Sequence, residues 1–214
     1  DGGVVVFDAT QGVEPQSETV WRQADRYAVP RICFINKMDR VGASYEYSIE
    51  SIRQRLGANP IPMQMPIGFE AAFAGVVDLL EMHAVYWEDE QGREMTIRPI
   101  PAEMQAEAEA ARAIMVERIA EVDDELTVKF LEGETLSVDE LKGGLRRAVL
   151  AGTATPVFCG TALRNKGIQL ILDAAIDYLP SPLEVPAVVG IDPQSGDEIS
   201  RPPDDSAPLS ALVF

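Results

Sequence analysis

Two hydrophobic periods alternate along the first 57 residues of the chain. Residues 4–7 (VVVF) and 32–35 (ICFI) are continuous apolar runs, which is typical of strands buried on both faces of a parallel sheet. After each run, apolar residues recur at helical spacing, over 15–30 and then over 45–57. This order predicts an α/β fold with a parallel sheet, whose ligands bind at the carboxyl ends of the strands.

The pattern changes from about residue 58. Short apolar stretches edged by prolines, with a turn at Gln91-Gly92, predict short strands and a hairpin. Helical periodicity follows within 101–121 and near 123–132, and a third helix is expected after Ser137, which has capping-box spacing to Glu140. We interpret residues 58–153 as an inserted α+β subdomain.

The buried-strand pattern returns at 155–160, and an amphipathic helix is expected to follow it up to residue 179. Both would complete the first sheet, so we expect one interrupted domain comprising residues 1–57 and 154–180. A proline-rich linker leads to an apolar run at the end of the chain, which resembles the start of a strand. Residues 181–214 are therefore expected to be a linker and the start of a truncated domain, in a piece of a longer protein.

The composition excludes two classes of protein. With 18 basic and 35 acidic side chains the formal charge is −17, which argues against binding nucleic acid through a broad basic surface. No run approaches the ~18 apolar residues of a membrane span, and no basic, then apolar leader precedes a cleavage site. At 46% apolar residues the chain can bury a core, and we expect a soluble, cytoplasmic protein.

The residues directly after the second strand suggest a guanine-binding site. Asn36-Lys37-Met38-Asp39 would lie at the carboxyl end of that strand. One carboxylate, that of Asp39, can accept from both guanine N1–H and the exocyclic amino group, which adenine does not offer. Asn36 would brace the loops and approach the N7/O6 edge, and the stem of Lys37 would cover the base. Because so short a motif also occurs by chance, it requires a second loop.

The segment CGTALRNKG, after the strand at 156–159, supplies a candidate for that second loop. The Ala162 N–H would donate to guanine O6, the Thr161 hydroxyl would orient Asp39, and Leu163 would form a wall of the pocket. The two loops are far apart in sequence. They meet only if the inserted subdomain separates strands that are neighbours in the sheet.

Two long segments resemble the bacterial elongation factor G family of translational GTPases. They are DGGVVVFDATQGVEPQSETVWRQADRYAVPRICFINKMDRVGA and TPVFCGTALRNKGIQLILDAAIDYLPSPLEVP, and the resemblance continues through LGANPIPMQMPIG and KFLEGE. It implies the back half of a P-loop GTPase-type domain, the whole inserted subdomain and the start of a β-barrel domain. It also implies binding of GTP or GDP, GTP-driven movement of tRNA and mRNA through the ribosome, and ribosome recycling. Thr161 stands where the family usually has Ser.

The chain contains no G-x-x-x-x-G-K-[ST] sequence, so it lacks the loop that would hold the nucleotide phosphates and the hydroxyl for Mg²⁺. By the resemblance, the γ-phosphate segments and the catalytic histidine would precede Asp1. We therefore expect the chain alone to be inactive, with no catalytic residue and no metal ligand, and Mg²⁺ only in the full-length protein. For the single histidine, His83, we expect a structural or surface role.

The resemblance also implies partners and leaves alternatives open. The Glu-rich helix within 101–121 would contact the stalk protein of the large ribosomal subunit, although a merely solvated face is an equal alternative. Ribosomal RNA would be contacted mainly by parts outside this chain, which we expect to be monomeric and not bound to a membrane. Alternatives are a ribosomal protection protein, a paralogous elongation factor, or a nucleotide-free module that binds the stalk protein.

Several other side chains are expected to be structural. Cys33 and Cys159 are interpreted as reduced, small core residues, because there is no C-x-x-C sequence. Asp8 and Glu14 could ligate a metal, but a carboxylate at a helix start is favoured. The tryptophans and methionines are assigned to packing.

Overall fold

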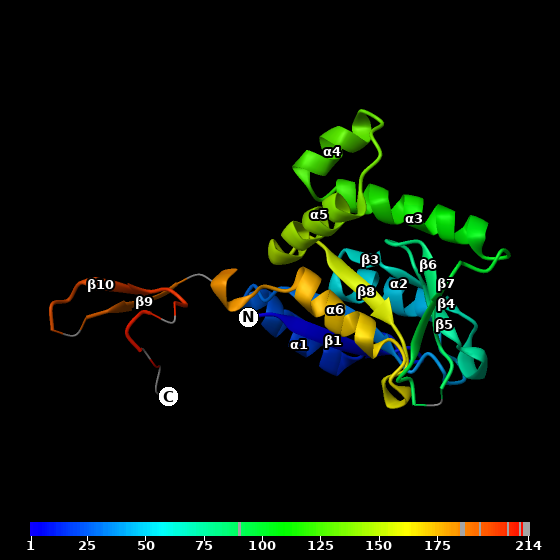
Figure 1. Cartoon of the computed structure of the whole chain (residues 1–214). Helices are drawn as coiled ribbons and strands as arrows, with labels where there is room; N and C mark the ends of the chain where they lie inside the picture. Colours follow the sequence, from blue (N-terminus) through cyan, green and yellow to red (C-terminus); the bar gives the residue numbers. More distant parts are fainter. Residues whose placement is uncertain (90, 185–186, 193, 205, 210, 212–214) are drawn as a thin grey trace. The chain divides into compact units, whose positions relative to one another are not determined.

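The computed structural model describes the whole chain except residues 90, 185–186, 193, 205, 210 and 212–214 (Figure 1). Residues Gly2–Leu179 form one compact unit, and Pro180–Phe214 belong to a second. In the part of the chain that is described, no helix has both the length and the apolar character needed to cross a membrane.

The first unit is built on a four-stranded parallel sheet, which confirms the predicted α/β fold. Its strands, in sheet order, are β1 (Gly3–Asp8), β2 (Arg31–Asn36), β8 (Thr155–Cys159) and β3 (Pro60–Pro62). β8 lies directly beside β2, as the inserted-subdomain interpretation requires. β3 differs from the prediction, because residues from 58 onward were assigned to the insert. It pairs with β8 at the edge of the sheet. Its two prolines lack a backbone N–H, which is tolerated at an edge because no further strand of the described sheet lies on the outer side to accept a hydrogen bond.

Helices cover both faces of this sheet (Figure 1). On one face, α1 (Pro15–Arg26) and α2 (Tyr45–Leu56) pack through residues such as Trp21 and Ile52 against Cys33 and Ile35 of β2. On the other, α6 (Ile168–Tyr178) packs against the alternate residues Ile32 and Phe34. The alternation follows from the two-residue period of a strand.

α2 has the boundaries that its sequence predicts. The Ser44 side chain accepts from the Tyr47 N–H at the start of the helix, and Gly57 ends it in the left-handed conformation (φ 63°).

β1 differs from its prediction. The run at 4–7 was expected to be buried on both faces, yet Val4 and Val6 are 45% and 55% exposed. Phe7, by contrast, is 1% exposed and packs in the core on the α1/α2 face. β1 is an edge strand of the described sheet, and only one of its faces is covered.

A second, antiparallel sheet with three helices makes up the rest of the insert, which confirms the additional α+β part. Its strands, in sheet order, are β4 (Gln64–Ile67), β5 (Gly75–Asp78), β6 (His83–Trp87) and β7 (Met95–Arg98). A short 3₁₀ turn, η1 (Glu70–Ala72), connects β4 to β5. The helices α3 (Gln105–Ala120), α4 (Asp124–Leu131) and α5 (Val138–Leu150) follow.

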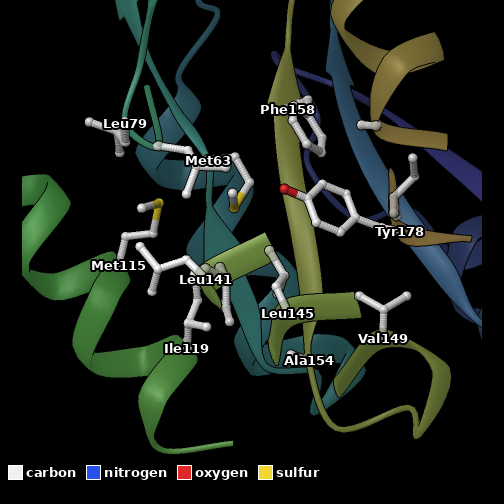
Figure 2. Close-up of a cluster of buried hydrophobic side chains, with 14 of the residues drawn as sticks. Met63, Leu79, Met115, Ile119, Leu141, Leu145, Val149, Ala154, Phe158 and Tyr178 are labelled. Carbon is white, nitrogen blue, oxygen red and sulfur yellow. The ribbon is translucent and has the colours of Figure 1, made fainter. Parts of the chain in front are cut away.

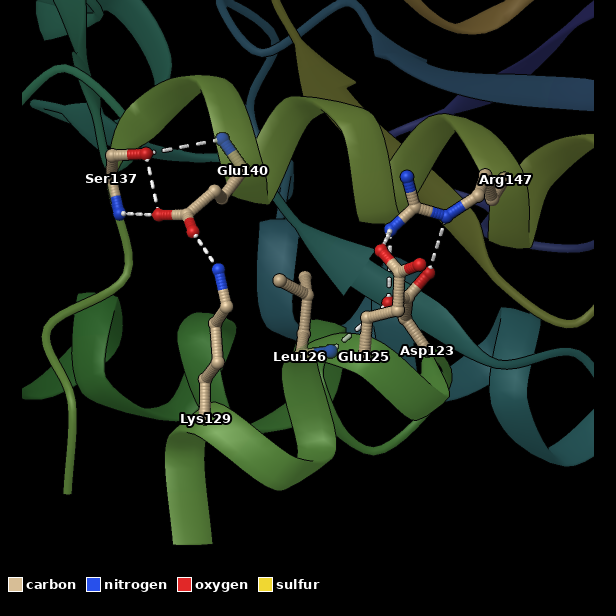
Figure 3. A network of polar contacts seen from close by, with 7 residues as sticks. All are labelled: Asp123, Glu125, Leu126, Lys129, Ser137, Glu140 and Arg147. Carbon is tan, nitrogen blue, oxygen red and sulfur yellow. Dashed lines mark hydrogen bonds and ion pairs between the residues drawn. The ribbon is translucent and has the colours of Figure 1, made fainter. Parts of the chain in front are cut away.

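Polar contacts fix α4 against α5 (Figure 3). The predicted capping box at Ser137 and Glu140 is present, and Lys129 of α4 pairs with the same glutamate. At the other end, Asp123 accepts from the Leu126 N–H at 3.1 Å and pairs with Arg147 at 2.7 Å. The hydrogen bond from Arg147 lowers the pKa of Asp123. One carboxylate thus both starts α4 and holds it to α5.

The larger cluster of buried side chains is shared by the parallel sheet and the insert. Figure 2 shows Phe158 of β8 and Tyr178 of α6 close to Met63, with Leu141 and Leu145 of α5 below them. The cluster extends to Met115 and Ile119 of α3 and Leu79, which follows β5. The tryptophans are buried as predicted, with Trp21 5% and Trp87 3% exposed.

In the second unit, a 3₁₀ turn η3 (Pro182–Glu184) precedes a hairpin of β9 (Val188–Ile191) and β10 (Glu198–Arg201). Of the terminal apolar run at 208–214, expected to begin a strand, residues 210 and 212–214 lie outside the described residues. The residues of that run that are described are not in a strand. The assignment to a β-barrel domain stays a prediction.

Candidate nucleotide-binding site

Two loops leave the carboxyl ends of β2 and β8 side by side. The first loop (residues 36–44) starts where β2 ends, and the second loop (residues 160–167) follows β8. The strands pair in parallel with Ile35 opposite Cys159, so the two loops leave the sheet at the same level. The loops are then joined directly, because Gly160 N–H donates to Ile35 O at 3.0 Å and Met38 N–H to Gly160 O at 3.1 Å.

Asn36 braces the two loops. Its Oδ1 accepts from the Lys37 N–H at 2.8 Å and from the Ala162 N–H at 2.9 Å. The second bond differs from the sequence-based expectation that the Ala162 N–H is available to a guanine O6. In this structure the N–H is used by the carboxamide of Asn36, so a base would have to share it or displace that contact.

Asp39 is held by two residues of the second loop. The Thr161 hydroxyl donates to Asp39 Oδ1 at 2.7 Å, which is the orienting contact expected from sequence. Arg164 Nε lies 3.2 Å from Asp39 Oδ2. Sequence reasoning missed this ion pair, although Arg164 follows Thr161 closely in the same short loop. The arginine side chain is 57% exposed, so a ligand could displace it at small cost.

Lys37 pairs with the end of β1. Its Nζ lies 2.6 Å from Asp8 Oδ2. Asp8 also accepts from Thr10, through N–H at 2.9 Å and the hydroxyl at 2.7 Å. Burial opposes ionisation of Asp8, but the hydrogen bonds from Lys37 and Thr10 outweigh it and lower its pKa to about 2. Asp8 is therefore a lysine partner rather than a helix-start carboxylate.

Glu14 has the position that was expected of it, since it is the N-cap residue of α1. Within the described residues, no group of three or more His, Cys, Asp or Glu side chains could hold a metal ion.

The second loop is a closed turn. Thr161 and Lys166 exchange backbone hydrogen bonds at 2.9 and 3.2 Å, and the 3₁₀ turn η2 (Ala162–Arg164) lies between them. Gly160 is required here, because a Cβ on it would lie 2.2 Å from Lys166 O. Leu163, at the tip, is 96% exposed, so it would form a wall only against a bound ligand.

The two cysteines are free thiols, as predicted. Both are fully buried on the same face of the sheet, and Cys33 lies opposite Val157 rather than Cys159. Burial raises the pKa of both thiols far above its ordinary value.

Residues 1–181 match the model of the elongation factor Tu GTP-binding domain. The chain belongs to this family. It is 55% identical to elongation factor G of Thermotoga maritima and 53% identical to elongation factor G of Fervidobacterium nodosum, in each case over all 214 residues. The matches cover 100% of the chain but only 31% of each relative, so the chain spans about a third of their length.

A solved structure also resembles this chain. A crystal structure of a protein from Thermus thermophilus superposes with a TM-score of 0.78 at 28% identity, covering 94% of this chain and 31% of that one. The family of GTP-binding domains is thus established by sequence, and the parallel sheet with an additional antiparallel part agrees with it.

Proposed function

We propose that the full-length protein containing this chain is a GTP-binding translation elongation factor that promotes movement of tRNA and mRNA through the ribosome, and ribosome recycling. The observation that carries the proposal is the hydrogen bond from Thr161 to Asp39, which joins the two strand-end loops. It holds a carboxylate beside the backbone of the second loop, where a guanine needs its acceptor and donor.

In this proposal Asp39 reads guanine N1–H and N2–H₂ after Arg164 moves aside. Asn36 holds the second loop and offers its amide to the N7/O6 edge. Lys37 covers the base while its ammonium stays on Asp8, and Leu163 closes the opposite side. The Ala162 N–H would turn from Asn36 to guanine O6.

The phosphate-binding sequence G-x-x-x-x-G-K-[ST] does not occur in the chain. We therefore propose that the chain alone hydrolyses no GTP and binds GDP weakly. In the full-length factor Mg²⁺ would be bound with the nucleotide phosphates, through residues outside this chain. The chain's 31% share of its elongation factor G relatives supports that division of roles.

The exposed carboxylates of α3 and α4 support a ribosomal partner. They include Glu107, Glu109 and Glu117 of α3, and Asp124 and Glu125 at the start of α4. This acidic charge favours a partner with a basic surface, and we propose the stalk protein of the large subunit. The same charge favours a second candidate function, a module that binds the stalk protein without nucleotide.

The test is the substitution Asp39→Asn in the full-length factor. The asparagine amide would donate toward a guanine amino group that also donates, so the affinity for guanine should fall. Xanthine carries an oxygen at position 2 that can accept from this amide, so the affinity for xanthine should rise. The GDP affinity should fall roughly 30- to 5000-fold, and xanthosine diphosphate should become the preferred ligand.

The exposed Asp173→Asn on α6 is the matched control, with no change in either affinity. An Asp39→Asn protein that still preferred guanine would refute the assignment. Binding of labelled stalk protein by the nucleotide-free factor, with no binding of GDP, would favour the second candidate.

A further inference from the structure

The insert holds the second loop through a residue between β6 and β7. The Gly92 carbonyl accepts from Asn165 Nδ2 at 3.0 Å and from Gln169 Nε2 at 2.8 Å. Trp87 of β6 donates from its indole Nε1 to Gln169 Oε1 at 3.1 Å. Both ends of the Gln169 carboxamide are thus used by the insert, although the residue belongs to the first turn of α6.

The approach at Gly92 is too close for any other residue. Gly92 is buried and has φ +59°, and a Cβ on it would lie 2.2 Å from Arg164 O. Arg164 and Asn165 form the part of the second loop that turns back toward α6. Asn165 is itself left-handed (φ 55°), a conformation that asparagine tolerates and that its bond to Gly92 helps to hold.

From this contact the connection to the proposed base reader is short. Asn165 directly precedes Lys166, which exchanges backbone hydrogen bonds with Thr161, and Thr161 donates to Asp39. A shift of the turn at residues 164–165 would therefore move the Thr161 hydroxyl relative to Asp39.

The first loop is also held by the insert. Gly42 N–H donates to Glu70 Oε1 at 2.7 Å, and Glu70 belongs to η1, between β4 and β5. Its φ of 51° is unusual for a glutamate. Two separate connections of the antiparallel sheet thus contact the two loops.

We propose that the insert positions the base-reading loops, with Gly92 and Gln169 as positioning residues for guanine recognition. The inference rests on the proposed function and deepens it. Because coupling between two sites is reciprocal, bound guanine nucleotide would in turn hold the 91–94 segment in place.

Gln169→Leu in the full-length factor is the primary test. Leucine keeps the approximate shape but removes the donor to Gly92 and the acceptor for Trp87. We expect GDP affinity to fall about 5- to 30-fold, because the Trp87 indole N–H loses its acceptor and the Gly92 carbonyl keeps only the donor from Asn165. Gln54→Leu is the matched control, since Gln54 lies on the exposed surface of α2 and its side chain donates to Glu50 of the same helix. It should leave GDP affinity within about twofold.

A double-mutant cycle separates positioning from general destabilisation. If Gln169 acts through the second loop, the effects of Gln169→Leu and Thr161→Val should not be independent. The fold-loss of GDP affinity in the double variant should be smaller, by at least about threefold, than the product of the two single fold-losses. Trp87→Phe provides a second variant, which keeps an aromatic ring but removes the indole donor together with some buried volume. It should weaken GDP binding about 2- to 5-fold and speed amide hydrogen exchange in residues 160–167.

Wild-type GDP affinity in both Gln169→Leu and Trp87→Phe would overturn the inference, as would strictly multiplicative effects in the cycle. These results are distinguishable from a failure of the proposed function. If the proposed function fails, Asp39→Asn will leave the base preference unchanged. If only the positioning role of the insert fails, Asp39→Asn will still switch the preference to xanthine, and the Gln169 and Trp87 variants will bind GDP as the wild type does.

Discussion

The Thr161 hydroxyl donates to Asp39 Oδ1 at 2.7 Å across 122 residues of sequence. Thr161 is 2% exposed, so water competes little for this bond. The pair joins the ends of two neighbouring strands and fixes the direction of the candidate base-reading carboxylate. The geometry requires only a hydroxyl at this position.

Replacing Thr161 by Val should therefore weaken guanine binding, whereas Ser should preserve it. Valine keeps the shape of threonine but leaves Asp39 without its orienting donor. We expect about a 5- to 10-fold rise in the Kd for GDP in the full-length factor, measured by fluorescence titration. Thr19→Val on the exposed surface of α1 serves as control. Equal losses for Thr161→Val and Thr161→Ser would show that the hydroxyl is not the relevant group.

Asp8 should make stability depend on acidity. Its folded pKa of about 2 lies below the ordinary 3.8, so its ionised form stabilises the folded state above about pH 4. That stability is lost as the pH falls through about 2. In urea unfolding between pH 4 and pH 2, the wild type should lose about 1 kcal/mol more than Asp8→Asn, allowing for solvent screening at the half-exposed Lys37. The exposed Asp173→Asn should follow the wild type. Parallel curves for wild type and Asp8→Asn would contradict the prediction.

Two adjacent glycines in α5 should respond to alanine with opposite signs. A Cβ on Gly143 meets nothing closer than Arg147 Nη1 at 3.5 Å, so Gly143→Ala should raise the free energy of unfolding by about 0.5–1 kcal/mol. A Cβ on Gly144 would lie 2.3 Å from Cδ1 of the buried Leu126, so Gly144→Ala should lower it by about 1–3 kcal/mol. Urea unfolding of the chain measures both, and each variant is the control for the other. The same sign for both would mean that α4 does not pack on α5 as described.

Cys33 and Cys159 should be unreactive until the chain unfolds. Both are fully buried, and burial raises their thiol pKa, so little thiolate exists near neutral pH. Titration with a disulfide reagent at pH 8 should find almost no reaction in native protein and both thiols in denaturant, without any reductant. Rapid reaction of the native chain, or missing thiols in denaturant, would be inconsistent with this structure.

Local signals in the sequence predicted the elements well. Gly57 and the Ser137 capping box set helix ends because their effects act within one turn of the chain. The two strand-end loops were also predictable, since parallel neighbours place their carboxyl ends together.

Long-range pairings were not predictable. The Lys37 partner Asp8 and the Arg164 contact to Asp39 depend on which charged groups the folded loops bring within reach. The contact of Gly92 with Gln169 depends on how the insert is placed on α6. β3 was assigned to the insert because a three-residue strand that begins and ends with proline carries no hydrophobic period.

The shared core around Phe158 and Tyr178 has a consequence for cooperativity. These two side chains, from the parallel sheet and α6, pack in one cluster with Leu141 and Leu145 of the insert. Loss of α5 would expose apolar surface on both the parallel-sheet part and the insert. Neither of these two parts can therefore unfold locally without destabilising the other. Residues Gly2–Leu179 should therefore unfold in a single cooperative transition. The insert should also move together with the parallel sheet, so a force or a partner that acts on the insert would act on the sheet as well.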